Sequence, residues 1–268
     1  GTSNYILSSM DKDHKNFLDV LNKAKTLGYA ETNPASDLNG DDVAAKLKIL
    51  SSLCFNSYLN NNIHVEGIKN IDKEDIDNAN KLGYKIKLLG YAELINNNIF
   101  QRVHPTLIKT SSYVAGIDGV LNAVIIDGSP VGQSIIQGEG AGPTATTSAL
   151  VSDISSILRG NIKFPFSISN KKRKKLQFKN ISERFFSAYL RFEVADKSGV
   201  LSNITNIFSK SKVSIKRLIQ NPNKKKGTSS IVIVTHASKD KSYSKIVNQI
   251  DKKNYIIKKS KLIRIDDN

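Results

Sequence analysis

Four acidic side chains and one lysine crowd into residues 28–46, which read GYAETNPASDLNGDDVAAK. The first part contains an Asn-Pro and an Asn-Gly dipeptide, both typical of turns, so Glu31 and Asp37 are expected on irregular backbone. After the second turn, apolar residues recur at helical spacing, which places Asp42 and Lys46 one turn apart on a helix. Such a cluster could hold a small amino acid by its ammonium group and offer a proton acceptor to its side chain.

A purely structural explanation of the same stretch is equally open at this point. Asp41 and Asp42 occupy the first turn of the expected helix, where negative charge stabilises the helix dipole. The stretch would then be the solvated beginning of a surface helix. Motifs elsewhere in the chain are needed to decide between the two interpretations.

Five other segments accompany this stretch over nearly all of residues 1–160. They are GTSNYIL at 1–7, LGYKIKLLGYA at 82–92, RVHPTLI at 102–108, GVLNAV at 119–124 and GEGAGPTATTSALVSDI at 138–154. One motif of this kind is weak, but the six together, in this order, are specific: they resemble the homoserine dehydrogenase family.

The resemblance implies interconversion of L-homoserine and L-aspartate 4-semialdehyde, a step toward threonine and methionine, with hydride moving to or from NADP or NAD. Oxidising the homoserine hydroxyl requires a base for its proton, and Lys46 matches the family's catalytic lysine. A lysine with a pKa of ~10.4 must be shifted down to act as a base, and a nearby Asp42 would oppose that shift. We therefore expect Asp42 to orient the lysine or contact the substrate. The substrate-binding positions implied by the family are Thr2, Tyr29, Glu31, Asp37 and Asp42, and we expect the acids and Lys46 to line one pocket.

The glycine-rich segment 138–142 precedes an expected helix over 144–158. Closely spaced glycines let a backbone approach a ligand, and a helix N-terminus offers N–H donors, although a tight turn is the commoner explanation of the pattern alone. The resemblance implies that Gly138, Glu139, Gly140 and Gly142 approach the nicotinamide ring.

The chain opens inside what the family writes as Asn-Gly-Thr. The family's Rossmann-type domain, with its pyrophosphate-binding loop, ends at that point, so we expect the natural N-terminus to lie upstream. The chain by itself is expected to bind dinucleotide poorly and to catalyse little. A catalytically silent module that only senses amino acids remains an alternative.

Residues 1–160 are expected to form an α+β domain, a mixed sheet covered by helices, followed by a basic linker at 161–184. The family dimerises through the sheet expected within 85–137, so a homodimer is implied. Helices are expected over 4–28, 41–58, 72–83 and 144–158, and strands over 86–95, 99–104, 123–127 and 133–136.

Residues 185–268 read as a separate unit with the order strand, helix, strand, strand, helix, strand, which is the ferredoxin-like plan. Together with the turn VADKSGVL at 194–201, this order resembles an ACT domain, the amino-acid sensor often appended to biosynthetic enzymes. The resemblance implies effector contacts at Asp196, Gly199 and Asn203, with threonine as the first candidate effector. Ser198 stands where the family usually has proline.

Charge is distributed unevenly along the chain. The net charge is +16, and residues 170–268 hold 25 of the 40 Lys and Arg but only 7 of the 24 Asp and Glu. Such asymmetry is a hint of nucleic-acid binding, but aromatic residues are not interleaved with the basic runs, so a basic nucleic-acid-binding protein is the less favoured alternative.

Histidine and cysteine give little sign of chemistry here. His104 is the histidine most suggestive of catalysis, yet it lies outside the acid–lysine cluster and is expected to be structural. The single cysteine, Cys54, rules out a thiolate zinc site, and we expect it in the core of an intracellular, cytoplasmic protein without a metal. No apolar run approaches the ~20 residues of a membrane span.

Overall fold

A long hairpin forms the centre of the molecule. Strands β2 (Tyr84–Ile95) and β3 (Asn98–Lys109) pair antiparallel along their whole length. Asn96 and Asn97 form the tip with φ angles of 48° and 65°, a left-handed conformation that asparagine tolerates. This computed structural model describes residues 1–58, 63–140, 142–161, 168–223 and 226–267.

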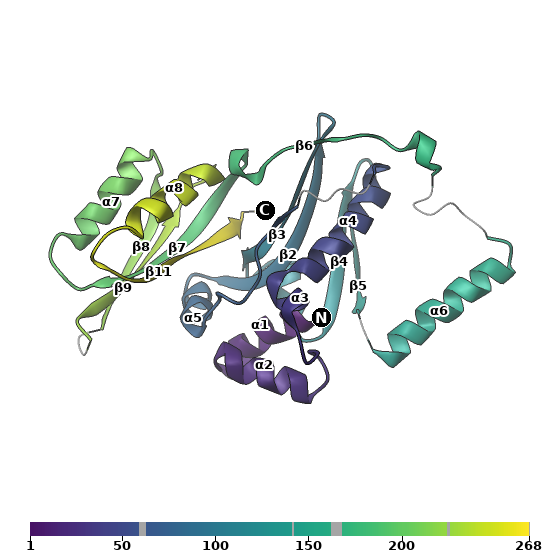
Figure 1. Ribbon diagram of the computed structural model, residues 1–268, viewed down its shortest axis with the longest axis horizontal. Helices are drawn as coiled ribbons and strands as arrows, with labels where there is room; N and C mark the ends of the chain where they lie inside the picture. Colours follow the sequence, from purple (N-terminus) through teal and green to yellow (C-terminus); the bar gives the residue numbers. More distant parts are fainter. Residues whose placement is uncertain (59–62, 141, 162–167, 224–225, 268) are drawn as a thin grey trace.

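The second edge of β3 pairs in turn with three different strands, all parallel to it. These are β6 (Gln177–Phe178), then β1 (His64–Val65), then β11 (Ile256–Asp266). Because β11 belongs to the C-terminal unit, the sheet of that unit continues directly into the central hairpin. Figure 1 shows the two parts side by side, with the hairpin in the middle of the molecule.

The C-terminal unit has the predicted ferredoxin-like order. Its elements are β7 (Phe185–Ala195), α7 (Val200–Lys210), β8 (Ile215–Asn223), β9 (Thr228–Thr235), α8 (Asp240–Ile250) and β11, with the two-residue β10 (Ser238–Lys239) between β9 and α8. The sheet order is β11-β7-β9-β8. Helices α7 and α8 cover one face, where Leu190, Phe192 and Ile204 are fully buried.

The opposite face of this sheet packs against the N-terminal helices. Tyr189, Val232 and Ile263 share one apolar core with Ile6 and Met10 of α1. A separate unit was the expectation for residues 185–268, whereas the structure joins them to residues 1–160 by a common sheet and a common core. The nearly continuous apolar run of β7 reflects burial of both of its faces.

The N-terminal helices differ from the predicted pattern in two places. The single helical stretch expected over 4–28 is two helices, α1 (Thr2–Asp13) and α2 (Phe17–Thr26), because the chain turns at His14, where φ is 51°. Asp37 was expected on irregular backbone but lies in a short helix, α3 (Ala35–Asn39), which Gly40 ends in a left-handed conformation.

Two further helices match their predictions closely. Helix α4 (Asp41–Phe55) begins directly after Gly40. Helix α5 (Lys73–Lys81) is capped by Asp72, whose side chain accepts from the backbone N–H of Asp75 while the Asp75 side chain accepts from that of Asp72. The prediction for Cys54 was wrong: this side chain is exposed in the last turn of α4, at the edge of the stripe formed by the buried Ala44 and Leu47.

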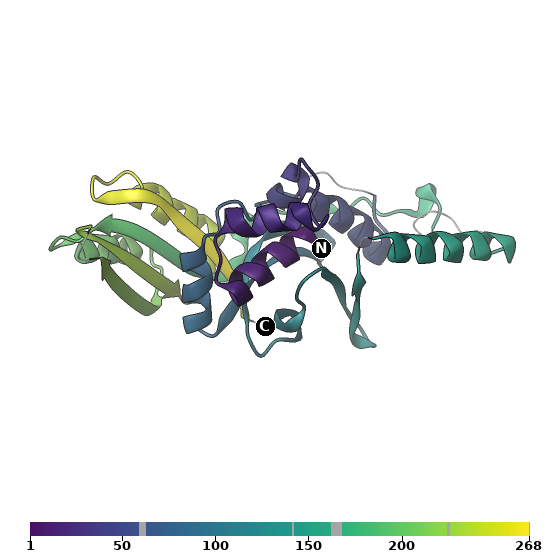
Figure 2. The same ribbon diagram turned by 90° about the horizontal axis from the view of Figure 1, so that it is seen from below.

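One hairpin and one helix stand apart from the main sheet. Strands β4 (Leu121–Gly128) and β5 (Gly132–Glu139) form a two-stranded sheet of their own, where one mixed sheet was expected. Helix α6 (Pro143–Leu158) has no buried side chain and extends away from the body in both views (Figures 1 and 2). Within the described ranges no helix has the length and apolarity to cross a membrane.

Candidate functional site

The first turn of α1 connects the segments that carry the predicted site residues. Thr2 Oγ1 donates a hydrogen bond to the carbonyl oxygen of Tyr29 (2.9 Å), and Ser3 Oγ donates to that of Asp37 (2.9 Å). The nitrogen of Gly1 donates to Oδ1 of Asn122 at 2.8 Å. Two substrate-binding candidates are thus held at the start of α1, Tyr29 by Thr2 and Asp37 by the neighbouring Ser3.

Lys46 and Asp42 form an ion pair on the exposed side of α4. The distance from Nζ to Oδ2 is 2.6 Å, and the side chains are 57 % and 39 % exposed. The charges of Lys46, Asp37 and Asp42 all act on the nitrogen of Gly1, at the start of α1. Lys46, Asp37 and Asp42 therefore gather around the start of α1.

Two other candidates lie at the margin of this cluster. Glu31 is exposed at the bend after α2, and with other described residues it makes no hydrogen bond or ion pair. The ring of Tyr29 packs on that of Tyr5 with centroids 4.9 Å apart, which leaves Tyr29 partly exposed. That Glu31 shares one pocket with Lys46 stays a prediction.

The glycine-rich loop approaches α1 through Asn122. Gly138, Glu139, Gly140 and Gly142 are all exposed, and Ala141 between them lies outside the described residues. A Cβ on Gly140 would lie 2.1 Å from Nδ2 of Asn122, so any side chain there would require the Asn122 amide or the loop to move. Sequence reasoning missed Asn122 as a link between α1 and this loop, although the residue lies inside the motif GVLNAV.

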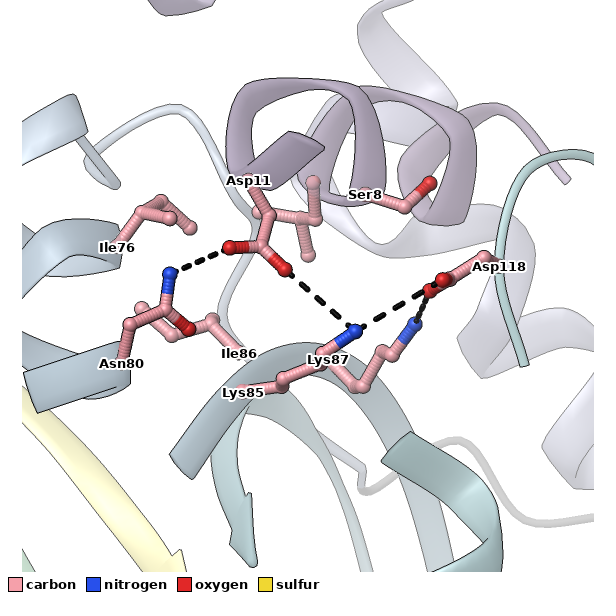
Figure 3. Close-up of a pocket in the computed structure, with 9 residues that line it drawn as sticks. Ser8, Asp11, Ile76, Asn80, Lys85, Ile86, Lys87 and Asp118 are labelled. Atoms are coloured by element: carbon pink, nitrogen blue, oxygen red, sulfur yellow. Dashed lines mark hydrogen bonds and ion pairs between the residues drawn. The ribbon is translucent and has the colours of Figure 1, made fainter. Parts of the chain in front are cut away.

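A buried lysine lies on the other side of α1, in a narrow pocket between α1, α5 and β2 (Figure 3). Lys87 Nζ donates to Asn4 Oδ1 (3.0 Å), the carbonyl oxygen of Ile117 (2.5 Å) and Asp118 Oδ1 (2.9 Å). Burial lowers the pKa of Lys87, against the opposing effect of Asp118. Sequence reasoning did not single out this lysine, and its position in the apolar motif LGYKIKLLGYA was the available signal.

His104 is buried and neutral. Burial and the nearby charge of Arg264 lower its pKa to about 3. Its ring lies near those of Tyr91 and Phe186, with centroids 6.1 and 6.3 Å away, in the region where β3 meets the C-terminal unit. This environment agrees with the structural role expected for His104.

A second pocket, of ≈ 340 Å³, opens at the first turn of the C-terminal unit. Two of the three predicted effector-binding residues, Asp196 and Gly199, line it together with Ser198 and Gln220. Asn203, the third, is exposed one turn further along α7 and is not part of the lining. The volume lies within the ~300–1,000 Å³ usual for small-molecule sites.

Fold and geometry together define an α+β protein that carries acidic residues and a lysine on α3 and α4 and ends in a ferredoxin-like unit. The family model for homoserine dehydrogenase matches residues 1–155, and that for the acetohydroxyacid synthase small subunit-like ACT domain matches residues 190–258. The chain belongs to the homoserine dehydrogenase family and carries an ACT domain.

Relatives and solved structures extend this result over the whole chain. The homoserine dehydrogenase of Helicobacter pylori is 36 % identical over 268 residues, and that of Bacillus subtilis is 32 % identical over 272 residues. The alignments cover the whole of this chain and 63 % of each relative. A crystal structure of a homoserine dehydrogenase from Thiobacillus denitrificans matches with a TM-score of 0.90 at 34 % identity, covering 100 % of this chain and 62 % of that one. The chain thus spans a little under two thirds of these proteins.

Proposed function

We propose that the full-length gene product carrying this chain is an NAD(P)-dependent homoserine dehydrogenase, which interconverts L-homoserine and L-aspartate 4-semialdehyde. The observation that carries the proposal is the cluster of Asp37, Asp42 and Lys46 around the first turn of α1, in a chain that belongs to this family. A primary amine beside carboxylates can exchange a proton with a hydroxyl while the carboxylates bind an ammonium group.

Each residue of the cluster has a distinct part in this mechanism. Lys46 takes the proton from the homoserine hydroxyl and returns it in the reverse direction, while Asp42 at 2.6 Å orients the lysine. Asp37 and Glu31 bind the amino and hydroxyl ends of the substrate, and Thr2 forms a further part of the substrate-binding surface. Because the Lys46 amine is largely exposed, bound substrate or an adjoining surface must exclude water before the amine can act as a base.

The glycine-rich loop fits a nicotinamide cofactor. Its backbone is exposed, and Gly140 is packed on Asn122 so closely that a side chain would displace either the loop or the amide. Gly138, Glu139, Gly140 and Gly142 would hold the ring beside the start of α1. When bound, NAD or NADP accepts or gives the hydride.

The C-terminal unit is proposed to bind an amino-acid effector, threonine first, in the pocket at Asp196 and Gly199. The exposed carboxylate of Asp196 can take the ammonium group, and the N-terminal backbone of α7 can take the carboxylate. A homodimer is proposed as the assembly, with the exposed apolar side chains Ile125, Val131 and Ile136 of the β4–β5 hairpin available for an interface.

The activity is tested on the full-length gene product with homoserine and either NAD or NADP, by following reduction of the dinucleotide. Homoserine-dependent reduction that serine does not support is the expected result. The absence of turnover with either dinucleotide in a folded sample, together with heat of threonine binding in calorimetry, would instead favour the second candidate function. That candidate is a catalytically silent amino-acid sensor, and the ≈ 340 Å³ pocket supports it.

A further inference from the structure

A buried arginine joins the C-terminal unit to the segment that lies beneath the predicted substrate acids. Arg264 of β11 is 3 % exposed and donates from Nε to Asp240 Oδ1 at 2.6 Å. Its Nη1 lies 3.0 Å from both carboxylate oxygens of Glu66. One guanidinium therefore pairs with a carboxylate of its own unit and with one from the central part of the molecule.

Glu66 begins a segment that packs against the end of α3. Its backbone N–H donates to the carbonyl oxygen of Val103 (2.8 Å), and two residues later Ile68 N–H donates to that of Leu38 (2.9 Å). Between them, Gly67 approaches so closely that a Cβ would lie 2.0 Å from the Leu38 oxygen. The 66–68 segment thus has little freedom to shift without moving Leu38.

The segment contacts residues 38–40, which connect Asp37 to α4. These residues determine the distance between Asp37 and the Asp42–Lys46 pair. Leu38 follows Asp37 directly, and Gly40, whose φ is 89°, precedes α4 with Asp42 and Lys46. A Cβ on Gly40 would meet Val65 and Val103 side chains at 3.2 Å. The distance between Asp37 on α3 and the Asp42–Lys46 pair on α4 is therefore set by contact with residues 65–68.

We propose that Glu66, held by Arg264, is a positioning residue for the substrate-binding acids. It fixes residues 66–68 under Leu38 and Gly40, so that Asp37 and the Asp42–Lys46 pair keep the separation that one small substrate requires. The last strand of the ACT unit thereby contributes to the geometry of a site that it does not touch. The kinetic effect expected from this inference rests on the proposed function, whereas the structural effect expected from it does not.

The chain offers matched controls for this proposal. Asp240 binds the same arginine from the opposite side and has no contact with the loop, so Asp240→Ala weakens the junction but leaves residues 66–68 paired. Arg191, 5 % exposed, makes a comparable junction to Asp72, Glu74 and Asp75 on and before α5, away from the 38–40 loop.

The kinetic test compares Glu66→Ala, Glu66→Gln and Asp240→Ala in the full-length gene product. Glu66→Ala is expected to raise KM for homoserine about tenfold or more and also to lower kcat, because both the binding acids and the proton-accepting Lys46 lose their spacing. Glu66→Gln keeps the shape and one acceptor and should recover part of the loss. Asp240→Ala and Arg191→Met should change KM by less than about twofold even though they lower thermal stability.

A second readout is independent of activity and uses residues 1–268 alone. Hydrogen–deuterium exchange of the Ile68 amide, and of the amides from Leu38 to Ala44, should accelerate at least about tenfold in Glu66→Ala and stay near wild type in Asp240→Ala. Equal acceleration in both variants, or none in either, would overturn the proposal. An inactive wild-type protein that shows the expected exchange pattern would refute the proposed function and leave the positioning role standing.

Discussion

Two regions of this molecule use the same charged residue types in opposite ways. At the start of α4, Lys46 and Asp42 pair at 2.6 Å while both remain substantially exposed. Around the central hairpin, Lys87 pairs with Asp118 at 2.9 Å with only 6 % of the lysine side chain exposed, and three oxygen acceptors surround its ammonium group.

The two lysines differ in how many of their hydrogen-bonding positions neighbouring groups already occupy. Burial lowers the pKa of Lys87, but carbonyl and carboxylate oxygens occupy its hydrogen-bonding positions, so no position is left for a substrate. Lys46 keeps most of its surface, and its known partner is one carboxylate a helical turn away. A buried, fully bonded charge fixes a fold, whereas an exposed pair beside other acids can still rearrange around a ligand.

The largest expected effect separates the two lysines by function. Lys46→Ala in the full-length gene product should lower kcat for homoserine oxidation on the order of 10²-fold or more, because it removes proton transfer from the transition state. Its unfolding free energy should change by less than about 0.5 kcal/mol, since exposed ion pairs contribute little. Near-normal turnover would show that another group carries the proton, and steady-state kinetics with parallel denaturant titrations decides the matter.

The second prediction concerns stability at the pocket of Figure 3. Lys87→Met should lower the unfolding free energy by about 2–3 kcal/mol, because Asp118 and the Ile117 carbonyl lose a buried donor. Lys85 is the control: two residues earlier on β2, it lies 3.6 Å from Asp11 and 3.8 Å from Asp118 and is more exposed. Lys85→Met should cost less than about 1 kcal/mol.

Urea unfolding of residues 1–268 measures both variants. Equal losses for Lys87→Met and Lys85→Met would mean that the burial of Lys87 contributes nothing of its own. The exposed and buried lysines would then differ in their contacts but not in this test of stability.

The third prediction uses pH to test whether burial keeps His104 uncharged in the folded protein. Its pKa of about 3 in the folded protein lies below the ordinary 6.5, so the unfolded chain takes up a proton that the folded one refuses. The stability that neutral His104 contributes is therefore fully present above pH 6.5 and is lost as the pH falls below it. Between pH 6 and 5 His104 alone should account for a loss of ~1.4 kcal/mol in the free energy of unfolding.

A variant isolates this contribution. His104→Gln, which has no titrating ring, should show a shallower pH dependence than wild type by about one proton. Identical slopes for the two proteins in this interval would show that His104 protonates without resistance in the folded state.

Much of this architecture could be predicted because local signals and global packing agree. The strands predicted over 86–95 and 99–104 correspond to β2 and to the first half of β3, and the order of the C-terminal unit was predicted correctly. The helix predicted over 72–83 was recognisable because helix-capping chemistry at its start is local. The break between α1 and α2 was missed because His14 carries no turn signal in its residue type. Helix α3 was missed because five residues between two turn dipeptides are too short for a period to show.

The pairing of β11 with β3 could not be predicted from the sequence. It joins residues 264–266 to 106–108, which lie far apart in the sequence, and pairing at such a separation leaves no local residue pattern. The site residues were predicted by resemblance for the most part. The groups that position them, such as Ser3, Asn122 and Glu66, act through contacts distant in sequence and therefore leave no spacing pattern.

The smallest expected effect sharpens the contrast between the two regions most directly. Asp42→Asn removes a charge that pairs with Lys46 one turn away and lies in the first turn of α4, where it also favours the helix dipole. An exposed i, i+4 pair contributes ~0.2–0.5 kcal/mol and a charge in the first turn a similar amount, so the loss of unfolding free energy should stay below about 1 kcal/mol.

Asp240→Asn is the counterpart in the buried junction, where the carboxylate is 5 % exposed and pairs with Arg264, and it should cost more than twice as much. Both substitutions keep the side-chain shape, so denaturant titration at low and high salt compares the two environments alone. Salt should weaken only the contribution of Asp42, because water and ions reach that pair. If Asp42→Asn cost as much as Asp240→Asn, independently of salt, the predicted catalytic pair would be a structural one.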